Sequence, residues 1–274
     1  MASGSDISEQ PWWEERILVT AKTYPIPHEK HHETVCTAGI NENGEWRRLW
    51  PIPFRHLTGP QQFRKYEWIE ARIRKQASDR RKESHVIDPE HLRATGEVVG
   101  PERNWQRRRD LILRWQAASL EELSDRYAKD FTSMGVFRPR DFGRLKITWR
   151  NKPHWSQELQ NKSEQRILWA SVPSLRPLPF QLHLEYRCDS PGCPGHEQSI
   201  MDWEMGARYW TEFERNPDER IAAEATKKAF SDFFTAEFDT WLHVGTLGPV
   251  WNSWVIISVF RPKAAAQASL FEYV

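Results

Sequence analysis

The chain has 274 residues and a formal net charge of +1 at pH 7, and 39% of its residues are hydrophobic and 28% charged. These values suit a folded, soluble protein with one large domain or two modest ones. No apolar run reaches the length of a membrane span, and three cysteines do not make a disulfide scaffold, so we expect a cytoplasmic protein with no membrane partner.

The charges are unevenly distributed along the chain. Residues 64–114 contain 14 Lys and Arg against 9 Asp and Glu, whereas residues 201–240 contain 5 against 10. The first region could face nucleic-acid phosphates, and the second is less suited to them. Of the 15 tryptophans, we expect most in the core and some as stacking platforms for unpaired bases.

The N-terminal part predicts a small β-rich unit at residues 16–100, preceded by a loose tail at 1–15. Strands are expected at 16–24, 33–40, 45–52 and 66–75, and the NENG segment predicts a tight turn between the second and third. Trp46 and Trp50 on the third strand are expected in the core rather than at a ligand. The three histidines of PIPHEKHHE are expected in a polar loop.

The next part predicts a second β-rich unit with helices at residues 101–262, followed by a flexible tail at 263–274. Helices are expected at 104–116, 119–130, 201–216 and 218–238, and Ser119 with Glu122 forms a capping-box pattern. Strands are expected at 144–149, 180–186, 240–248 and 253–260. The fold class is therefore α+β, with two small β-rich units and with intervening and C-terminal helices.

Cys188, Cys193 and His196 are spaced as potential metal ligands. Thiolate sulfur and imidazole nitrogen suit Zn²⁺, and the Pro and Gly residues between them predict turns that let the ligands converge. We expect structural zinc, with a fourth ligand from His183, Asp202, His243 or water. The alternative is a Pro/Gly turn with free cysteines.

Asp202 and Glu204 are the candidate catalytic pair. Two carboxylates could bind Mg²⁺ or act as acid and base, but positions two apart on a helix point in different directions. The favoured interpretation makes Asp202 a helix N-cap and places Glu204 in the first turn.

Two cationic segments predict a nucleic-acid surface. Guanidinium groups pair with phosphates, and an adjacent indole can stack on a base. The alternative for either segment is an ordinary solvated face. The candidate binding residues are Arg47, Arg48, Arg72, Arg74, Lys75, Arg80, Arg81, Lys82, Trp105, Arg107, Arg108 and Arg109.

The segment QASLF near the C-terminus resembles the sliding-clamp-binding peptide of bacterial replication and repair proteins. Gln267 would donate or accept hydrogen bonds while Leu270 and Phe271 enter an apolar pocket of the clamp. The alternative is a tail that folds back onto its own domain.

The segments VCTAGINENGEWRRLWPIPF and YRCDSPGCPGHEQSIMDWE, with the later HVGT and SWVIISVF, resemble a largely uncharacterised bacterial family with paired oligonucleotide-binding (OB) folds. Cys36, Ala38, Gly39, Trp46 and Arg48 match its signature. The resemblance implies two OB-like units and a role in DNA repair or anti-phage defence, with Cys36 buried and Arg47 or Arg48 facing a ligand. It supplies no catalytic residues.

The sequence thus predicts a zinc-stabilised nucleic-acid-binding protein, with DNA and single strands favoured. One alternative is a nuclease or DNA glycosylase, with Asp202, Glu204, His196 and His243, or Asp79 or Asp88, as candidate residues. Another is a protein-interaction subunit whose tryptophans contact a partner. The absence of known nucleophile, phosphate-loop and dinucleotide motifs favours binding over catalysis.

Overall fold

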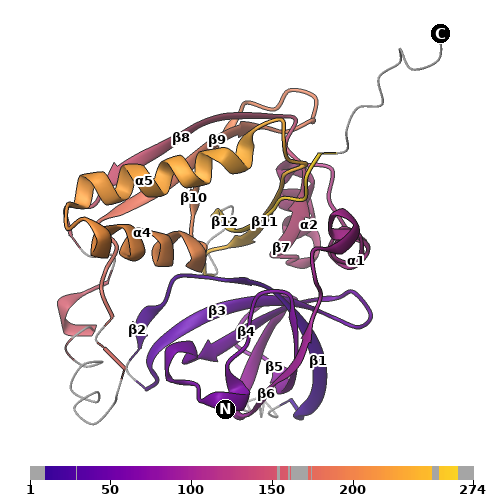
Figure 1. Cartoon of the computed structure of the whole chain (residues 1–274). Coiled ribbons are helices and arrows are strands. Elements are labelled where there is room, and N and C mark those ends of the chain that lie inside the picture. Colours follow the sequence, from indigo (N-terminus) through magenta and orange to yellow (C-terminus); the bar gives the residue numbers. More distant parts are fainter. Residues whose placement is uncertain are drawn as a thin grey trace, which may run out of the picture.

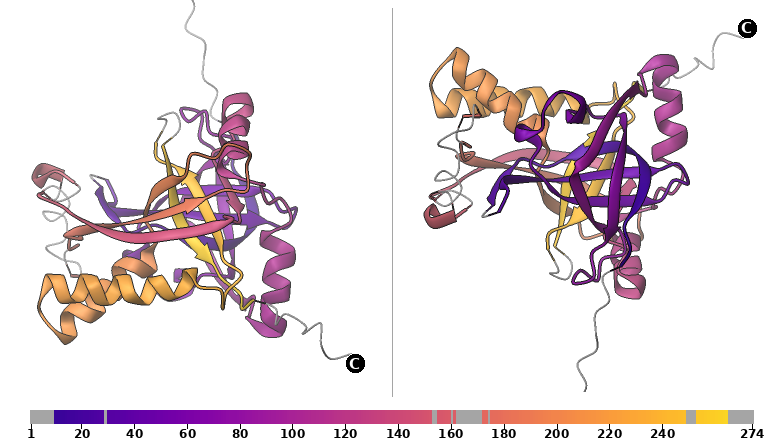
Figure 2. Two further views of the ribbon diagram at one scale, coloured as in Figure 1. Left: turned by 90° about the horizontal axis from the view of Figure 1, so that it is seen from above. Right: turned by 90° about the horizontal axis from the view of Figure 1, so that it is seen from below.

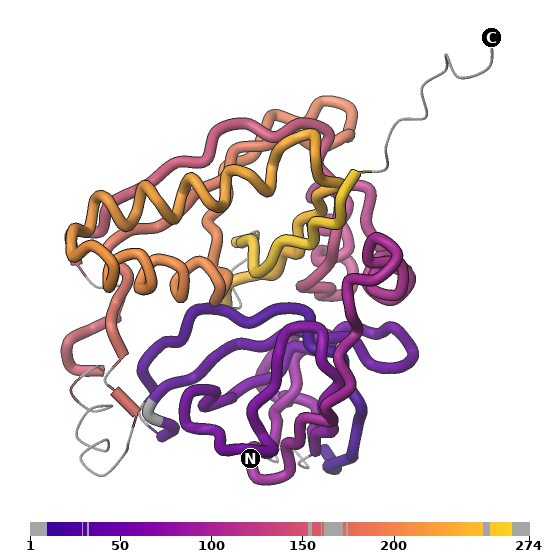
Figure 3. The backbone as a smooth tube through the Cα atoms, in the orientation of Figure 1, coloured from indigo at the N-terminus to yellow at the C-terminus, as the bar shows by residue number. Residues whose placement is uncertain are grey.

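The computed structural model describes residues 10–28, 30–152, 155–159, 161, 172–173, 175–248 and 253–264, without the side chain of residue 32. Its architecture is two stacked β-rich units, the N-terminal one below the C-terminal one in Figure 1. The chain passes from the first unit to the second through α1 (Glu102–Ile112) and α2 (Leu120–Asp130), as the backbone trace in Figure 3 shows.

The first sheet closes into a barrel. Its strands are β1 (Trp13–Lys22), β2 (Ile26–His28), β3 (His32–Asn41), β4 (Trp46–Ile52), β5 (Glu67–Lys75) and β6 (Ser84–Val98). Their order is β1-β5-β6-β4-β3-β2, and β1 also pairs with β3, so five strands form a closed ring with β2 at its edge. The β4–β6 pair is parallel and the other pairs are antiparallel. Alternate apolar side chains, such as Ile17 and Val19, fill the barrel.

The second sheet has the order β7-β11-β12-β10-β9-β8. Its strands are β7 (Met134–Phe137), β8 (Asp141–Trp149), β9 (Phe180–Arg187), β10 (His196–Ile200), β11 (Trp241–Thr246) and β12 (Trp254–Phe260). The β10–β12 pair is parallel, and no pairing among the described strands closes this sheet into a ring.

Helices cover the second sheet. The helices α4 (Trp203–Arg215) and α5 (Glu219–Ser231) lie together at one side of the molecule, and α1 and α2 lie at the other (Figure 2). The Phe180 and Tyr209 rings, 5.1 Å apart between centroids, join β9 to α4 in the largest apolar cluster. The described residues also form three short 3-10 turns: η1 (Phe54–His56), η2 (Gly59–Gln61) and η3 (Asp232–Phe234).

Two apolar clusters join the barrel to the second unit. One contains Leu18 and Ile40 of the barrel with Val136 and Phe260 of the second sheet. The other contains Ala21 and Ala38 of the barrel with residues of β7 and β12. Because these side chains are buried in shared clusters, the two units pack against each other through apolar contacts, and we call the boundary between them the seam.

The predicted fold class is confirmed at the level of an α+β chain with two β-rich sheets and a few helices. Four strands were not predicted, namely β2, β6, β7 and β10. β6 contains Pro89 and several charged residues, and its pairing with β5 has register shifts that break the alternation of apolar and polar residues. β10 is a short strand of mostly polar residues. The helix expected at 104–116 ends at Ile112, so Trp115 lies beyond it.

Candidate functional site

A cavity of about 500 Å³ lies in the seam. Its barrel side consists of β3, β4, the start of β6 and the two loops 23–31 and 76–83. Its other side comes from the second unit, through Met201, β12 and the end of β11. The residues that line it are Thr23, Tyr24, Ile26, Thr34, Cys36, Arg48, Trp50, Gln76, Ser78, Asp79, Arg81, Ser84, His85, Met201, Thr246, Leu247, Gly248, Val255 and Ile257.

Because β3 and β4 are pleated, alternate side chains of each strand face this cavity. Thr34 and Cys36 are two residues apart on β3, and Arg48 and Trp50 are two apart on β4, so each pair lies on one face of its strand. The indole Nε1 of Trp50 donates to Thr34 Oγ1 at 3.3 Å. Trp50 is nevertheless 39% exposed, so its expected place in the core was wrong, and its ring is open at the cavity.

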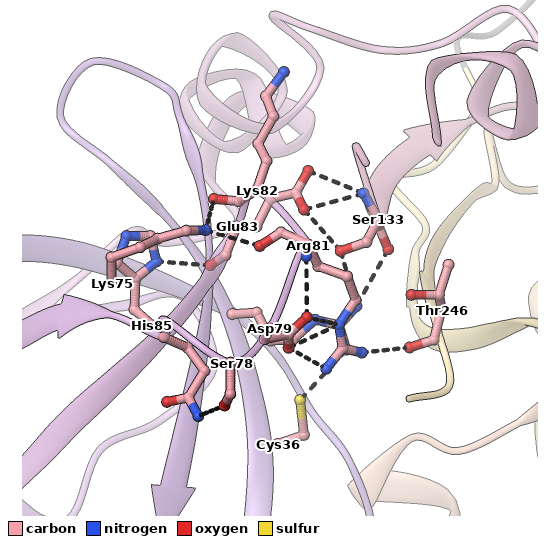
Figure 4. Close-up of polar contacts among 12 residues, drawn as sticks. Cys36, Lys75, Ser78, Asp79, Arg81, Lys82, Glu83, His85, Ser133 and Thr246 are labelled. Carbon is pink, nitrogen blue, oxygen red and sulfur yellow. Dashed lines mark hydrogen bonds and ion pairs between the residues drawn. The ribbon is translucent and has the colours of Figure 1, made fainter. Parts of the chain in front are cut away.

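Arg48 joins the barrel to the second unit through a hydrogen bond at the cavity wall. Its Nη2 donates to the Ser133 carbonyl oxygen at 3.2 Å, and its Nη1 lies 3.7 Å from Cys36 Sγ. Glu83 accepts hydrogen bonds from the Ser133 amide at 3.0 Å and from the Ser133 hydroxyl at 2.7 Å (Figure 4). Arg48 and Glu83 are both buried, so their contacts with Ser133 offset part of the cost of burying two charges, although Arg48 Nε has no hydrogen-bond partner among the described residues.

The loop 76–83 adds a second charged pair to the wall. Arg81 Nε lies 2.9 Å from both carboxylate oxygens of Asp79, and Arg81 Nη1 donates to the Thr246 carbonyl oxygen at 3.3 Å (Figure 4). Burial opposes ionisation of Asp79, but hydrogen bonds from Arg81 and Ser84 lower its pKa to about 2. Asp79 is therefore an anion that holds Arg81 in place, which does not suit a general acid or base near neutral pH.

His85 stands at the inner end of the cavity. Its ring nitrogen Nδ1 lies 2.7 Å from the Glu83 carbonyl oxygen, and the Trp13 ring meets it edge-on at 5.5 Å between centroids. Burial lowers the pKa of His85 to about 4, so the ring is neutral at physiological pH. A neutral imidazole can both donate and accept, which suits recognition of a polar heterocycle.

The structure brings only part of the predicted cationic set to the seam. Arg48 and Arg81 line the cavity, and Lys75 supports it by donating to the carbonyl oxygens of Arg81 and Lys82 at 2.8 and 2.6 Å. Lys82 lies next to Arg81 but points away from it (Figure 4) and pairs with Asp130 at 2.7 Å.

The other predicted cations do not line this cavity. Most contact carboxylates or aromatic rings of the protein itself: Arg47 with Glu15 and Glu45, Arg107 with Glu97, Arg109 with Asp239, Arg72 and Arg74 with Trp12, and Arg80 with Phe131. Of these, Arg47 lines a neighbouring cavity of the seam.

Trp105 and Arg108 correct the prediction most directly. The Trp105 ring packs edge-on against Tyr66 at 5.7 Å and Phe260 at 5.2 Å between centroids. Arg108 is buried, lies over the Tyr66 ring, and donates through Nε to the Val99 carbonyl oxygen at 2.6 Å. These two residues stabilise the junction of α1 with the barrel, so neither is placed to contact a nucleic acid.

A second cluster gathers four potential metal ligands. The Sγ atoms of Cys188 and Cys193, Nε2 of His196 and a carboxylate oxygen of Glu121 all lie within 4.8 Å of one another. His196 Nε2 is 3.3 Å from Cys193 Sγ and 2.9 Å from Glu121 Oε1. The predicted three residues therefore converge, and the fourth is Glu121 rather than His183, Asp202 or His243.

Local turns and a helix cap position this cluster. Gly192 and Gly195 have φ of 75° and 87°, values that glycine adopts readily, and they reverse the chain between β9 and β10. Ser119 caps α2 by accepting from the Glu122 amide at 3.2 Å, as predicted, which places Glu121 in the first turn. Glu122 bonds the Ala118 amide rather than that of Ser119 itself, so the expected capping box is only half formed.

The chemistry of the cluster fits a divalent cation. Glu121 Oε2 is buried without a hydrogen-bond partner, an arrangement that a cation would satisfy. Burial opposes ionisation of Glu121, but hydrogen bonds from its own amide, Ser119, Cys193 and His196 lower its pKa. Burial raises the pKa of the Cys188 thiol to about 12, whereas coordination to a cation favours the thiolate.

Asp202 and Glu204, the candidate catalytic pair, contact groups within the protein. Asp202 is the N-cap of α4, and its Oδ1 accepts from the Glu204 amide at 2.7 Å. Its other oxygen lies 3.8 Å from Lys65 Nζ, and the side chain is buried outside the seam cavity. The favoured capping interpretation is confirmed. Gln267, Leu270 and Phe271 of the predicted clamp-binding peptide lie outside the described residues.

Two family models match the chain in succession. One, described as Domain of unknown function (DUF8758), matches residues 13–114, and the other, described as Domain of unknown function (DUF8757), matches residues 116–274, more than half of the chain. The chain belongs to the DUF8757 family. The DUF8757 part contains the second sheet and the metal-ligand cluster, and the DUF8758 match contains the barrel, so the seam cavity lies between the two.

No curated protein matches the chain. Among the residues that the structure describes, no helix is long and apolar enough to cross a membrane. The two adjacent matches agree with the predicted two-unit organisation.

Residues of the candidate sites that the sequence did not reveal are Glu121 and Trp50. Glu121 is separated from His196 by 75 positions, and nothing in its local pattern distinguishes it from other acidic residues in a first helical turn. Trp50 alternates with Arg48 on one strand, and this pairing of an indole with a cation two residues away was the available signal.

Proposed function

We propose that the protein binds single-stranded nucleic acid in the seam cavity, with one base against Trp50. The observation that carries the proposal is the place of the cavity on the barrel. Counted along the chain without the edge strand β2, the five barrel strands are β1, β3, β4, β5 and β6, so β3 and β4 are the second and third. The segment 23–31 joins the first strand to the second, and the loop 76–83 joins the fourth to the fifth. In OB folds, this face and these two loops bind oligonucleotides and oligosaccharides.

The barrel itself supports an OB-like assignment of the first unit. It has five strands in a closed ring, and the chain returns from β5 to β6 so that β6 pairs in parallel with β4, as a Greek-key path requires. The second sheet has a different strand order, so we propose one OB-like unit and a second unit that closes over its ligand face.

The lining of the cavity suits a nucleotide. Trp50 offers an exposed ring for stacking, and the side chains of Gln76 and Ser78 bring amide and hydroxyl groups that can bond the edge of a base. Arg48 and Arg81 supply positive charge at the cavity wall, and the Asp79 carboxylate neutralises the charge of Arg81. DNA and RNA share this chemistry, and the expected role in DNA repair or anti-phage defence stays a prediction.

The test is equilibrium binding of a fluorescent single-stranded oligonucleotide of about ten nucleotides, measured by anisotropy over a range of salt concentrations. We expect saturable binding that weakens as salt rises, because phosphate contacts release counterions. Trp50→Ala should weaken binding by about tenfold, whereas Trp149→Ala, an equally exposed indole on β8, should not. Absence of salt-sensitive binding by the folded wild-type chain would refute the proposal.

We also propose that Glu121, Cys188, Cys193 and His196 hold one structural Zn²⁺. The metal would cross-link the start of α2 to the β9–β10 turn, two segments that lie far apart in the sequence. One zinc per chain by elemental analysis, lost in Cys193→Ser and retained in Cys36→Ser, is the expected result. Wild-type protein purified without chelator and free of bound metal would contradict this proposal.

A further inference from the structure

A second cavity of about 650 Å³ lies in the seam beside the first. Arg81 lines the first cavity and its neighbour Lys82 lines the second, and His85 lines both, so the two cavities meet at the end of loop 76–83. The residues that line the second cavity are Gly44, Glu45, Trp46, Arg47, Lys82, Glu83, His85, Trp115, Arg126, Lys129, Asp130, Thr132 and Met134.

Trp115 is the most exposed large apolar side chain among the residues that the structure describes, at 57%. The apolar spacing of the sequence predicts it on the buried face of a helix, but α1 ends at Ile112 and leaves it in the connection to α2. One edge of its indole lies along the β3–β4 turn, where a Cβ added to Gly44 would be 3.1 Å from Trp115 Nε1. The turn therefore supports the ring while most of its surface stays open to solvent.

Cations surround this exposed ring. The Arg114 guanidinium lies 5.4 Å from the ring centroid, and Lys82, Arg126 and Lys129 line the same cavity. Three acidic residues line this cavity: Glu45 pairs with Arg47, Glu83 is buried against Ser133, and Asp130 pairs with Lys82. Arg126 pairs with Glu122, so the charges in excess beside Trp115 are those of Arg114 and Lys129, and this excess favours an anionic chain.

Two of the four exposed indoles among the described residues line these cavities. Trp50 lies at the first cavity and Trp115 at the second, whereas Trp13 meets His85 edge-on but lines neither cavity, and Trp149 lies on β8. Successive rings beside positive charge are the arrangement that single-stranded nucleic acids use, because every base has a face that stacks.

We propose that Trp115 forms a second base-stacking site, so that a strand bound at Trp50 continues past loop 76–83 and places a later base on Trp115. This inference rests on the function proposed above and extends it by giving the path of the strand. It predicts that affinity depends on Trp115 only when the oligonucleotide is long enough to span both cavities.

The experiment measures the Kd of wild type, Trp115→Ala and Trp149→Ala for a series of single-stranded oligonucleotides, from dinucleotides to about ten nucleotides. We expect Trp115→Ala to weaken binding of the longest member by about tenfold and to leave the dinucleotide unaffected, with Trp149→Ala unchanged throughout. Trp115 is exposed, so its removal leaves the fold intact, and the melting temperature checks this.

Three other outcomes are informative in different ways. If wild type binds the series and Trp115→Ala binds every length as wild type does, the second site is refuted and the proposed function stands. If wild type binds no member of the series, the proposed function itself fails. An equal loss for Trp115→Ala and Trp149→Ala would show a general surface effect, which also refutes the second site.

Discussion

His243 is a neutral histidine enclosed by the seam. Its ring lies 4.6 Å from the Trp46 ring between centroids, and its Nε2 has no hydrogen-bond partner among the described residues. Burial, with the nearby charges of Lys65 and Arg48, lowers its pKa from the usual 6.5 to about 3. It is therefore a packing residue, not the metal ligand or catalytic group that the sequence left open.

The free energy of unfolding should depend on pH through His243. Between pH 6.5 and 3 the unfolded chain binds a proton here that the folded chain does not, so stability is lost as pH falls. Between pH 6 and 4, we expect the slope of the unfolding free energy against pH to be smaller in His243→Gln than in wild type by about 1 kcal/mol per pH unit. His91→Gln, at an exposed ring, is the control. A slope equal to that of wild type would contradict the assignment.

Asp202 combines a helix cap with a buried ion pair. Asp202→Ala removes the cap of α4 and one of the two carboxylates beside buried Lys65, while Glu204 stays 3.6 Å from Lys65 Nζ. We therefore expect a loss of about 2 kcal/mol of unfolding free energy in urea titrations. Glu204→Gln, at a half-exposed side chain, should change it by about 0.5 kcal/mol or less. Unchanged stability together with loss of a nucleic-acid-processing activity would instead support a catalytic Asp202.

At the residue scale, the sequence predicted what is local. Ser119 and Asp202 were recognisable as caps because a cap bonds an amide two or three residues on. The convergence of Cys188, Cys193 and His196 was predictable because the three residues lie close together in the sequence. Glu121 was not, because its place in the cluster depends on how α2 packs beside the β9–β10 turn.

At the scale of elements, the closure of the barrel depends on a close approach of β1 and β3. Gly39 pairs with Val19, and a Cβ at Gly39 would lie 2.5 Å from Ile17 Cγ2 and 2.6 Å from the Leu18 carbonyl oxygen. The glycine of the Cys-x-Ala-Gly pattern is therefore a packing requirement of the barrel rather than a ligand contact.

Gly39→Ala should thus destabilise the whole chain. Part of the contact is backbone, which cannot rotate away, so we expect a loss of about 1–3 kcal/mol in the free energy of unfolding, measured by chemical denaturation. A variant as stable as wild type would mean that β1 and β3 are farther apart than described here.

The elements divide into those with strong periodic patterns and those without. β1, β3, β4 and β5 were predicted because apolar runs and alternation persist along them. β6 was not, although it supplies a wall of the seam cavity, because it bends through register shifts and carries charged residues. The sequence predicts a cationic surface at the loop 76–83, whereas Arg81 of this loop pairs with Asp79 of the same loop.

At the scale of the molecule, the sequence predicted two β-rich units but not the seam between them. Composition and periodicity report on single elements, while the cavity exists only because the second sheet packs over the ligand face of the barrel. The uneven charge along the chain was a real feature, yet folding distributes most of those cations into internal pairs. The two seam cavities are lined by two of the four exposed indoles of the described residues, Trp50 and Trp115, and by a few arginines.

The central claim is that single-stranded nucleic acid lies in the seam. Photocrosslinking with a bromouracil-containing single strand, followed by mass-spectrometric mapping of the attached peptide, tests it directly on the intact chain. The account predicts crosslinks at Trp50 and in residues 76–85, reduced by unlabelled competitor. Crosslinks confined to β8 and β9, at one edge of the second sheet, or none at a concentration that saturates binding, would contradict it.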